Sequence, residues 1–210
     1  MIEHLIFDFD GTISDSYPLF LHFYDEIAAA RGISLVCDRD TLYHAIKQTA
    51  YEGYLASGFD RYFGYKEFCD LFHGLQWEHR MEFRAFPEAV TLLRNSLSEG
   101  KKNYLYTHSG PMVSDMLCNM GISDCFTFLL DSSYGFPMKP APDALQFLCR
   151  ELHLPVERCA MIGDRPIDSA AGRNAGMLGC LWDADGLFSR EAEEVYVRKL
   201  TELPEELKKF

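Results

Sequence analysis

The chain has 210 residues, of which 48% are hydrophobic and 25% are charged, and its formal net charge is −12. This length suffices for one large domain, or for a core domain with a smaller appendage. The negative charge argues against binding to nucleic acid or to anionic membranes, which requires a basic surface, and no apolar run approaches the ~20 residues of a membrane helix.

Neither the N-terminus nor the cysteines indicate export or a zinc site. Residues Met1–His4 lack the basic start and the long apolar stretch of a signal peptide, so we expect a cytoplasmic protein. The seven cysteines are odd in number and scattered without a CxxC pair. This pattern argues against a disulfide framework and against zinc, and predicts reduced, mostly packed thiols.

The first predicted strand, Leu5–Phe9, is followed by a long stretch without any strand pattern. From about residue 16 to residue 83 the sequence instead shows helical patterns at Leu19–Arg31, Arg39–Thr49 and Tyr65–Glu82. The stretch is rich in aromatic residues and too long for an ordinary crossover between neighbouring strands. It predicts an all-helical subdomain inserted after the first strand, with most of the aromatics in its core.

After this stretch, strand and helix patterns alternate to the end of the chain. Short apolar segments with turn residues after them predict the remaining buried strands: Asn103–Tyr106, Phe126–Leu130, Cys159–Ile162 and Leu178–Trp182. The helical patterns are Glu88–Leu97, Met112–Met120, Pro142–Leu152 and Asp168–Ala175. The alternation predicts an α/β fold with a doubly wound, Rossmann-like parallel sheet.

Two aspartates stand at the end of the first predicted strand. Asp8 and Asp10 are followed by Gly11, which allows a sharp turn close to a ligand. Alternate residues of a strand share a face, so the two carboxylates should project together at the sheet edge where ligands bind. A calcium-binding EF-hand loop is excluded, because Ile13 and Leu19 occupy the positions that require glycine and glutamate.

A second acidic pair follows the Cys159–Ile162 strand. Asp164 lies at the strand end, and Asp168 lies at or just inside a helix start, where it could instead serve as an N-cap. Hard oxygen ligands from two separate strands are typical of a magnesium site, because Mg²⁺ takes few protein carboxylates and keeps several waters.

Two further polar residues follow predicted strands. Thr107 leads into His108-Ser109-Gly110, where a hydroxyl and turn amides could bind phosphate oxygens. Lys139 lies just before a predicted helix. Each residue alone is a weak signal, but both follow strands in the same way as Asp8 and Asp164.

Four segments in this order resemble the haloacid dehalogenase superfamily, and most closely its phosphoglycolate-phosphatase-like branch. They are DFDGTISDS (8–16), YLYTHSG (104–110), GFPMKPAPDAL (135–145) and GDRPIDSAAGRNAGM (163–177). The resemblance spans nearly the whole chain, including a helical cap after the first segment.

The resemblance implies a Mg²⁺-dependent phosphatase that acts on a small phosphorylated metabolite. Asp8 would attack phosphorus and form an aspartyl-phosphate, and Asp10 would act as general acid and then general base. The metal would be bound by the Asp8 carboxylate, the Asp10 main-chain carbonyl and Asp164, with Asp168 acting directly or through water.

The resemblance also implies a phosphate-binding group. Thr107 and the His108 amide would bind the phosphoryl oxygens, and Lys139 would neutralise the anions around Asp8. Many relatives have asparagine where this chain has His108, and the side chain of His108 is open to two interpretations: contact with substrate, or packing.

The implied domain organisation is an α/β core at residues 1–15 and 84–210 with a helical cap at residues 16–83. The cap would open and close over the strand ends. It carries no specificity motif, although Lys47, Arg61 and Lys66 could reach a substrate anion. Nothing in the sequence indicates the substrate or an oligomeric state.

Two alternatives remain open at this stage. One is a phosphosugar mutase similar to β-phosphoglucomutase, although Phe20 occupies the position where such mutases carry histidine and His22 lies two residues further on. The other is a non-catalytic phosphate-binding relative. The chain has no GxGxxG, GxxxxGK[ST] or GxSxG motif, so dinucleotide-binding, P-loop and serine-hydrolase functions have no support.

Overall fold

The computed structural model describes residues 1–210, which form two compact units. The first unit combines Met1–Asp15 with Arg84–Phe210, and the second is Ser16–Phe83. In the first unit the chain segments that lead to and from the second are hydrogen-bonded together, because the Asp15 N–H donates to the Arg84 carbonyl. The assignment of these units as a catalytic core and a cap remains a prediction.

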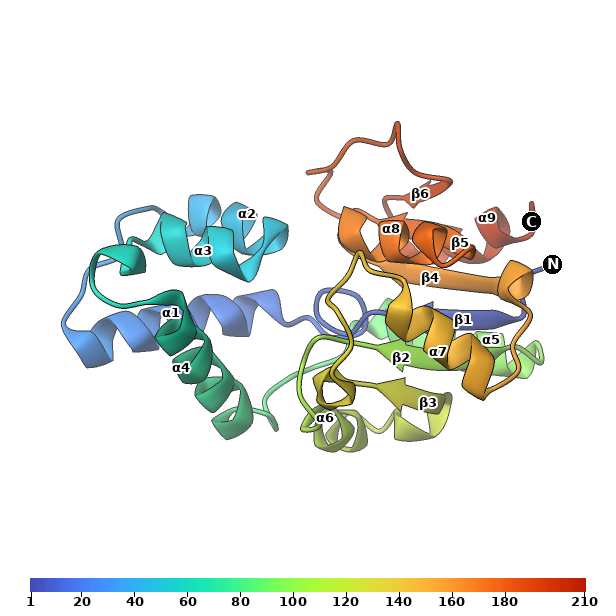
Figure 1. The fold of residues 1–210 in the computed structure, drawn as a ribbon, viewed down its shortest axis with the longest axis horizontal. Helices are drawn as coiled ribbons and strands as arrows, with labels where there is room; N and C mark the ends of the chain where they lie inside the picture. Colours follow the sequence, from blue (N-terminus) through green and yellow to red (C-terminus); the bar gives the residue numbers. More distant parts are fainter. The chain divides into compact units, whose positions relative to one another are not determined.

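A six-stranded parallel sheet forms the centre of the first unit. Its strands are β1 (His4–Phe7), β2 (Lys102–Tyr106), β3 (Phe126–Leu130), β4 (Cys159–Gly163), β5 (Leu178–Trp182) and β6 (Val195–Val197). They are ordered β3-β2-β1-β4-β5-β6 and every neighbouring pair is parallel (Figure 1). The order reverses beside β1, and open α/β sheets bind ligands at the carboxyl ends of the strands at such a switch point.

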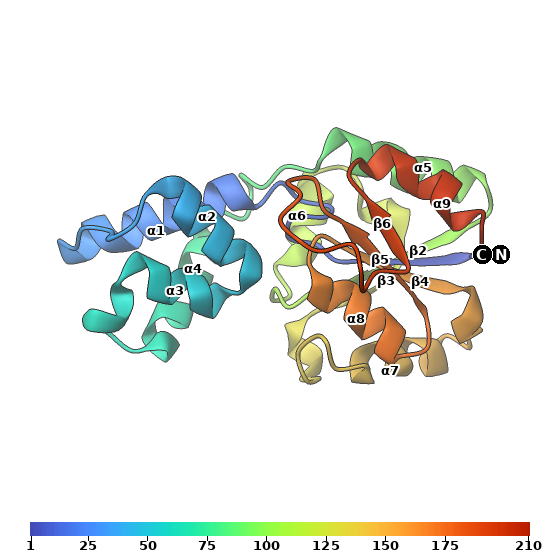
Figure 2. The same cartoon turned by 90° about the horizontal axis from the view of Figure 1, so that it is seen from above.

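Helices cover both faces of the sheet, which explains the continuous apolar runs in its central strands. The helices of this unit are α5 (Pro87–Ser98), α6 (Val113–Asn119), α7 (Asp143–Glu151), α8 (Pro166–Asn174) and α9 (Leu203–Leu207). Figure 2 shows α5 and α9 on one face and α7 and α8 on the other. On the second face Ile6, Tyr104 and Met161 form one buried cluster with Leu145 and Leu148 of α7. The predicted α/β fold class is confirmed.

The second unit is entirely helical. It contains α1 (Tyr17–Arg31), α2 (Arg39–Gln48), α3 (Ala50–Ser57) and α4 (Tyr65–Glu78). Most of its aromatic residues pack in its core, as predicted: Tyr24 stacks on Phe59 with ring centroids 5.7 Å apart, and Phe20 contacts Phe72 edge to face at 5.1 Å. Trp77 is an exception, with 53% of its surface exposed.

Several predicted boundaries differ from the structure. The first strand ends at Phe7 rather than Phe9, because the chain turns there: the Phe9 carbonyl accepts hydrogen bonds from the N–H groups of Ile13 and Ser14. Gly11 adopts a positive φ of 79° in this turn, a conformation that favours glycine. Strand β6 and helices α3 and α9 were not predicted. None of the helices combines the length and the apolar character needed to cross a bilayer.

The cysteines are all free thiols. Cys125, Cys159 and Cys180 are buried, Cys37, Cys69 and Cys149 are partly buried, and Cys118 alone is exposed. The prediction of unpaired and mostly packed cysteines therefore agrees with the structure.

Candidate active site

The structure brings the predicted site residues of the first unit together at the carboxyl edge of its sheet. They follow different elements: Asp8 and Asp10 follow β1, Thr107 and His108 follow β2, Lys139 lies in the connection between β3 and α7, Asp164 follows β4, and Asp168 lies in α8. Because β1, β2 and β4 are adjacent, residues more than a hundred positions apart in sequence become neighbours.

Three carboxylates form a buried cluster. Oxygen atoms of Asp8, Asp164 and Asp168 all lie within 4.8 Å of one another, and none of these residues is more than 2% exposed. One oxygen of the cluster, Asp8 Oδ2, is buried without a hydrogen-bond partner. Buried polar atoms normally have partners, so an unsatisfied carboxylate oxygen among other hard oxygen donors fits a site for a metal cation.

Lys139 supplies a positive charge beside this cluster. Its Nζ donates to Asp8 Oδ1 at 2.5 Å, to Asp168 Oδ1 at 2.8 Å and to the Tyr106 carbonyl at 2.9 Å. These bonds use all three donors of the ammonium group. The Lys139 side chain is 0% exposed, so a residue type that usually lies at the surface is fully buried here.

Burial and the surrounding charges shift the pKa values of the two carboxylates that share Lys139, Asp8 and Asp168, in opposite directions. Burial raises the pKa of Asp8 to about 7, and the opposing attraction of Lys139 does not cancel this rise. Burial acts on Asp168 in the same direction, but the charges of Lys139 and Arg165 and the hydrogen bonds from both residues outweigh it and lower its pKa. Of the two carboxylates that share Lys139, Asp8 is therefore the more easily protonated when no metal is present.

The position of Asp168 depends on tight local packing. The N-cap of α8 is Arg165 and Asp168 is the third helical residue, so the alternative of an Asp168 N-cap was wrong. Its Oδ2 accepts a hydrogen bond from the Arg165 N–H at 3.1 Å, which satisfies a donor at the helix start. Gly163 is required opposite, because a Cβ at this position would lie 2.2 Å from the Asp168 Cβ.

The Asp10 carboxylate lies outside the carboxylate cluster. Its Oδ2 accepts a hydrogen bond from Ser109 Oγ at 2.7 Å. Thr107 Oγ1 in turn accepts from the Ser109 N–H at 3.0 Å, which shapes the turn after β2. Asp8 and Asp10 thus have different partners, although they are only two residues apart.

The side chain of His108 contacts Lys139. Its Nε2 accepts a hydrogen bond from the Lys139 backbone N–H at 2.9 Å. Burial, reinforced by the charge of Lys139, lowers the pKa of His108 to about 3, so the imidazole is neutral at physiological pH.

Three residues that contact the site were not singled out from the sequence. Ser109 binds Asp10, the Tyr106 carbonyl binds Lys139, and the Arg165 N–H binds Asp168. Each is within one or two positions of a predicted site residue, so adjacency to a strand end was the available signal. Backbone groups such as the Tyr106 carbonyl have no signal of their own in the residue types.

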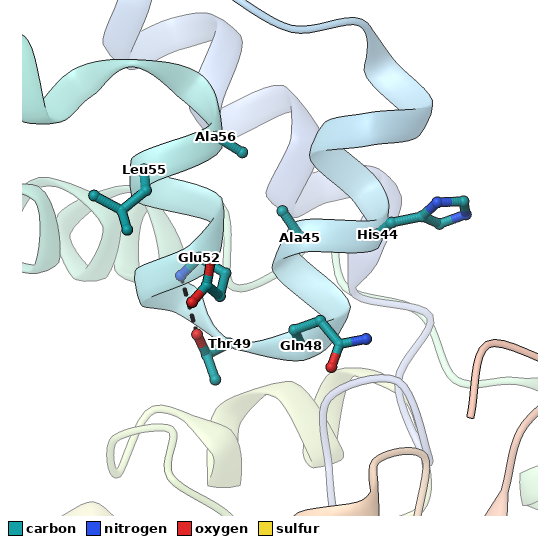
Figure 3. A pocket seen from close by; sticks show the side chains of 7 residues that line it. All are labelled: His44, Ala45, Gln48, Thr49, Glu52, Leu55 and Ala56. Atoms are coloured by element: carbon teal, nitrogen blue, oxygen red, sulfur yellow. Dashed lines mark hydrogen bonds between the residues drawn. The ribbon is translucent and has the colours of Figure 1, made fainter. Parts of the chain in front are cut away.

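The cationic residues of the helical unit differ in their surroundings. Lys66 is exposed and pairs with Asp70 at 2.7 Å, whereas Lys47 is buried, with its Nζ 4.7 Å from the centre of the Tyr17 ring. An open depression of this unit lies between α2 and α3 (Figure 3) and contains none of the predicted site residues. Its lining residues are His44, Ala45, Gln48, Thr49, Glu52, Leu55 and Ala56.

Comparisons with known proteins identify the family. A phosphoglycolate phosphatase of Vibrio cholerae is 26% identical over 83% of this chain and 81% of its own length. Protein CbbY of Cereibacter sphaeroides is 23% identical over 92% of this chain and 88% of its own length. A crystal structure of CbbY from Rhodobacter sphaeroides in complex with xylulose-1,5-bisphosphate superposes with a TM-score of 0.77 at 19% identity, covering 97% of this chain and 96% of that one.

The family assignment rests on a match over most of the chain. Residues 2–176 match the haloacid dehalogenase-like hydrolase family, a span that includes all seven predicted site residues. The chain is therefore an enzyme of the hydrolase class and belongs to the haloacid dehalogenase-like hydrolase family.

Proposed function

We propose that this chain is a Mg²⁺-dependent phosphatase that hydrolyses the phosphate monoester of a small metabolite through an aspartyl-phosphate on Asp8. The observation that carries the proposal is the environment of the Asp8 carboxylate. Its Oδ1 accepts a hydrogen bond from Lys139, whereas its Oδ2 is buried next to the carboxylates of Asp164 and Asp168 and has no hydrogen-bond partner. An unsatisfied carboxylate oxygen at a strand end is available both to a metal and to an electrophile.

The residues of the carboxylate cluster fit a magnesium ion. Asp8, Asp164 and Asp168 contribute hard oxygen donors, and the cluster carries more negative charge than Lys139 neutralises. We assign Asp8, Asp164 and the Asp10 main-chain carbonyl as ligands, with Asp168 acting directly or through water. When bound, Mg²⁺ would neutralise charge on the phosphoryl oxygens as a Lewis acid.

In the first step an Asp8 oxygen forms a bond to phosphorus, and the bond between phosphorus and the ester oxygen breaks. Asp10 donates a proton to the departing oxygen as general acid. In the second step water attacks the phosphorus of the aspartyl-phosphate, Asp10 accepts a proton from that water, and Asp8 leaves as a carboxylate. The Ser109 bond to Asp10 supports these roles, because it orients that carboxyl group separately from the cluster.

The remaining site residues bind the transferred group. Thr107 is 2% exposed and directly follows β2, and we assign its hydroxyl and the His108 amide as donors to phosphoryl oxygens. Lys139 would balance the negative charge that accumulates around Asp8. Uncatalysed phosphate-monoester hydrolysis is among the slowest reactions known, with enzymatic accelerations of up to ~10²¹-fold, so several groups must act together.

The proposed substrate class is supported by relatives rather than by a pocket. One relative is named phosphoglycolate phosphatase, and a CbbY structure contains xylulose-1,5-bisphosphate. Both ligands are small phosphorylated metabolites. We therefore propose a substrate of that class, with the helical unit acting as a cap that contributes to its recognition.

The surroundings of Phe20 favour hydrolysis over a mutase reaction. Phe20 occupies the position at which the mutase resemblance requires histidine, and it is buried among Phe23, Phe72 and Phe83. The nearby His22 pairs instead with Glu26 at 3.0 Å. No acid–base group of the mutase type therefore occupies position 20.

The test is phosphate release from p-nitrophenyl phosphate and a panel that includes phosphoglycolate, sugar phosphates and sugar bisphosphates. We expect turnover with Mg²⁺, none with chelator and none in Asp8→Asn. The matched control is Asp124→Asn, which removes an exposed carboxylate paired with Arg94 and should retain activity. Turnover that persists in Asp8→Asn would contradict the proposal, and turnover only with a bisphosphate primer would favour the mutase.

A further inference from the structure

The chain around Lys139 has no regular structure to hold it. Residues 135–138 belong to no helix or strand, and α7 begins only at Asp143. The Lys139 side chain nevertheless lies buried between two carboxylates. A loop residue with a fully buried charge needs anchoring contacts from elsewhere in the fold.

The end of β2 and the turn that follows it provide contacts at both ends of Lys139. At the side-chain end, the Tyr106 carbonyl accepts from Nζ at 2.9 Å, and the Tyr106 ring centre lies 4.5 Å from the same atom. At the backbone end, His108 Nε2 accepts from the Lys139 N–H at 2.9 Å. The His108 ring also packs edge to face on Tyr106, with centroids 5.8 Å apart.

We propose that His108 is a positioning residue whose neutral imidazole fixes the backbone of Lys139 and thereby places the Lys139 ammonium between Asp8 and Asp168. The effect on catalysis rests on the proposed function, which gives Lys139 its role. The hydrogen bond between His108 and the Lys139 backbone does not depend on that function. It resolves the question left open for the His108 side chain, whose acceptor atom is directed to the protein and not to a substrate anion.

The contact determines the protonation state of the ring. A backbone N–H can only donate, so Nε2 must carry a lone pair, and the proton of the neutral ring must sit on Nδ1. A second proton on Nε2 would break the contact and place a cation near the cations Lys139 and Arg165, whose effect Asp168 opposes. Burial and these two cations accordingly lower the pKa of His108.

The test compares His108→Gln with His108→Ala. Glutamine retains a side-chain acceptor of comparable reach, whereas alanine removes it. We expect His108→Ala to lower kcat about tenfold or more with KM changed less than about twofold, because a displaced Lys139 affects the reacting groups. We expect His108→Gln to recover most of kcat with an unchanged acid limb of the pH profile.

A second measurement does not depend on activity. Hydrogen exchange of the Lys139 amide in the Mg²⁺-free protein should be slow in the wild type and in His108→Gln, and at least about tenfold faster in His108→Ala. The inference would be overturned if the Lys139 amide exchanged equally fast in all three proteins. It would also be overturned if His108→Gln and His108→Ala shared the same raised KM and the same altered acid limb of the pH profile, because the imidazole itself would then act on the substrate. If no phosphate ester is hydrolysed by the wild type, the proposed function fails, and amide exchange still decides whether His108 anchors Lys139.

Discussion

Replacing Asp8 by asparagine should stabilise the metal-free protein while abolishing turnover. Asparagine has nearly the same shape as aspartate but cannot ionise. Asp8 is buried beside Asp164 and Asp168, and its pKa rises from the usual 3.8 to about 7, chiefly because of that burial. The substitution therefore removes a charge that the folded protein holds at a cost when no metal is bound.

The sign and the size of this change in unfolding free energy follow from the pKa of Asp8 in the unfolded chain and in the folded protein. Between pH 3.8 and about 7 the folded protein keeps a proton on Asp8 that the unfolded chain has released. The unfolded state then binds fewer protons, so stability falls as pH rises through this window. The raised pKa of Asp8 lowers the free energy of unfolding of the wild type by roughly 4 kcal/mol at pH 8 and by roughly 1–2 kcal/mol at pH 5. Asp8→Asn should be more stable than the wild type by up to these amounts.

The assay is urea unfolding of both proteins with chelator at pH 8 and at pH 5, followed by the same series with Mg²⁺. The stability advantage of Asp8→Asn should shrink by more than half at pH 5, and Mg²⁺ should stabilise the wild type more than the variant. Asp124→Asn, which affects only an exposed ion pair, should differ from the wild type by less than about 1 kcal/mol. The reasoning is refuted if Asp8→Asn is the less stable protein at pH 8, or if its advantage is independent of pH.

Three further substitutions test other contacts of the site. Gly163→Ala should cost about 2–4 kcal/mol of unfolding free energy by denaturant titration and most of the activity, because the added methyl overlaps Asp168; wild-type stability and activity would show that the overlap is relieved cheaply. Lys139→Met should abolish turnover and lower the unfolding free energy of the metal-free protein by about 3 kcal/mol, because Asp168 loses its buried partner. Lys139→Arg should also be inactive, because a planar guanidinium cannot replace three diverging ammonium donors. An active Lys139→Arg enzyme would contradict this. Ser109→Ala should lower kcat about tenfold without changing Mg²⁺ affinity measured by calorimetry, because Ser109 binds the Asp10 carboxylate, which lies outside the carboxylate cluster. A weakened Mg²⁺ affinity would show that the Asp10 carboxylate, and not only its main-chain carbonyl, takes part in metal binding.

The central strands and the strand-end aspartates could be predicted because burial leaves a strong pattern in the sequence. Strands covered on both faces, such as Cys159–Gly163, read as short continuous apolar runs. A carboxylate that follows such a run, such as Asp8 or Asp164, must lie at the sheet edge where ligands bind. The order of the motifs then indicated the family.

Other features depend on contacts that no local pattern encodes. Strand β6 has only three residues, Val195–Val197, and lies at the sheet edge, so its apolar signal is short. Helix α3 follows α2 directly, because Thr49 both ends α2 and caps α3 through its side chain. The anchoring of Lys139 by His108 joins residues 31 positions apart, and its hydrogen-bond geometry appears only in the folded chain.

The central claim is that Asp8 forms a covalent bond to phosphorus. The most direct test is to mix the Mg²⁺-loaded enzyme with a substrate found in the panel, quench in acid within the first turnover, and map the protein by mass spectrometry. The account predicts one added phosphoryl group on the peptide that contains Asp8, lost on treatment with hydroxylamine and absent from Asp8→Asn. A wild-type enzyme that turns over substrate but never carries this group, or carries it on another residue, would contradict the account.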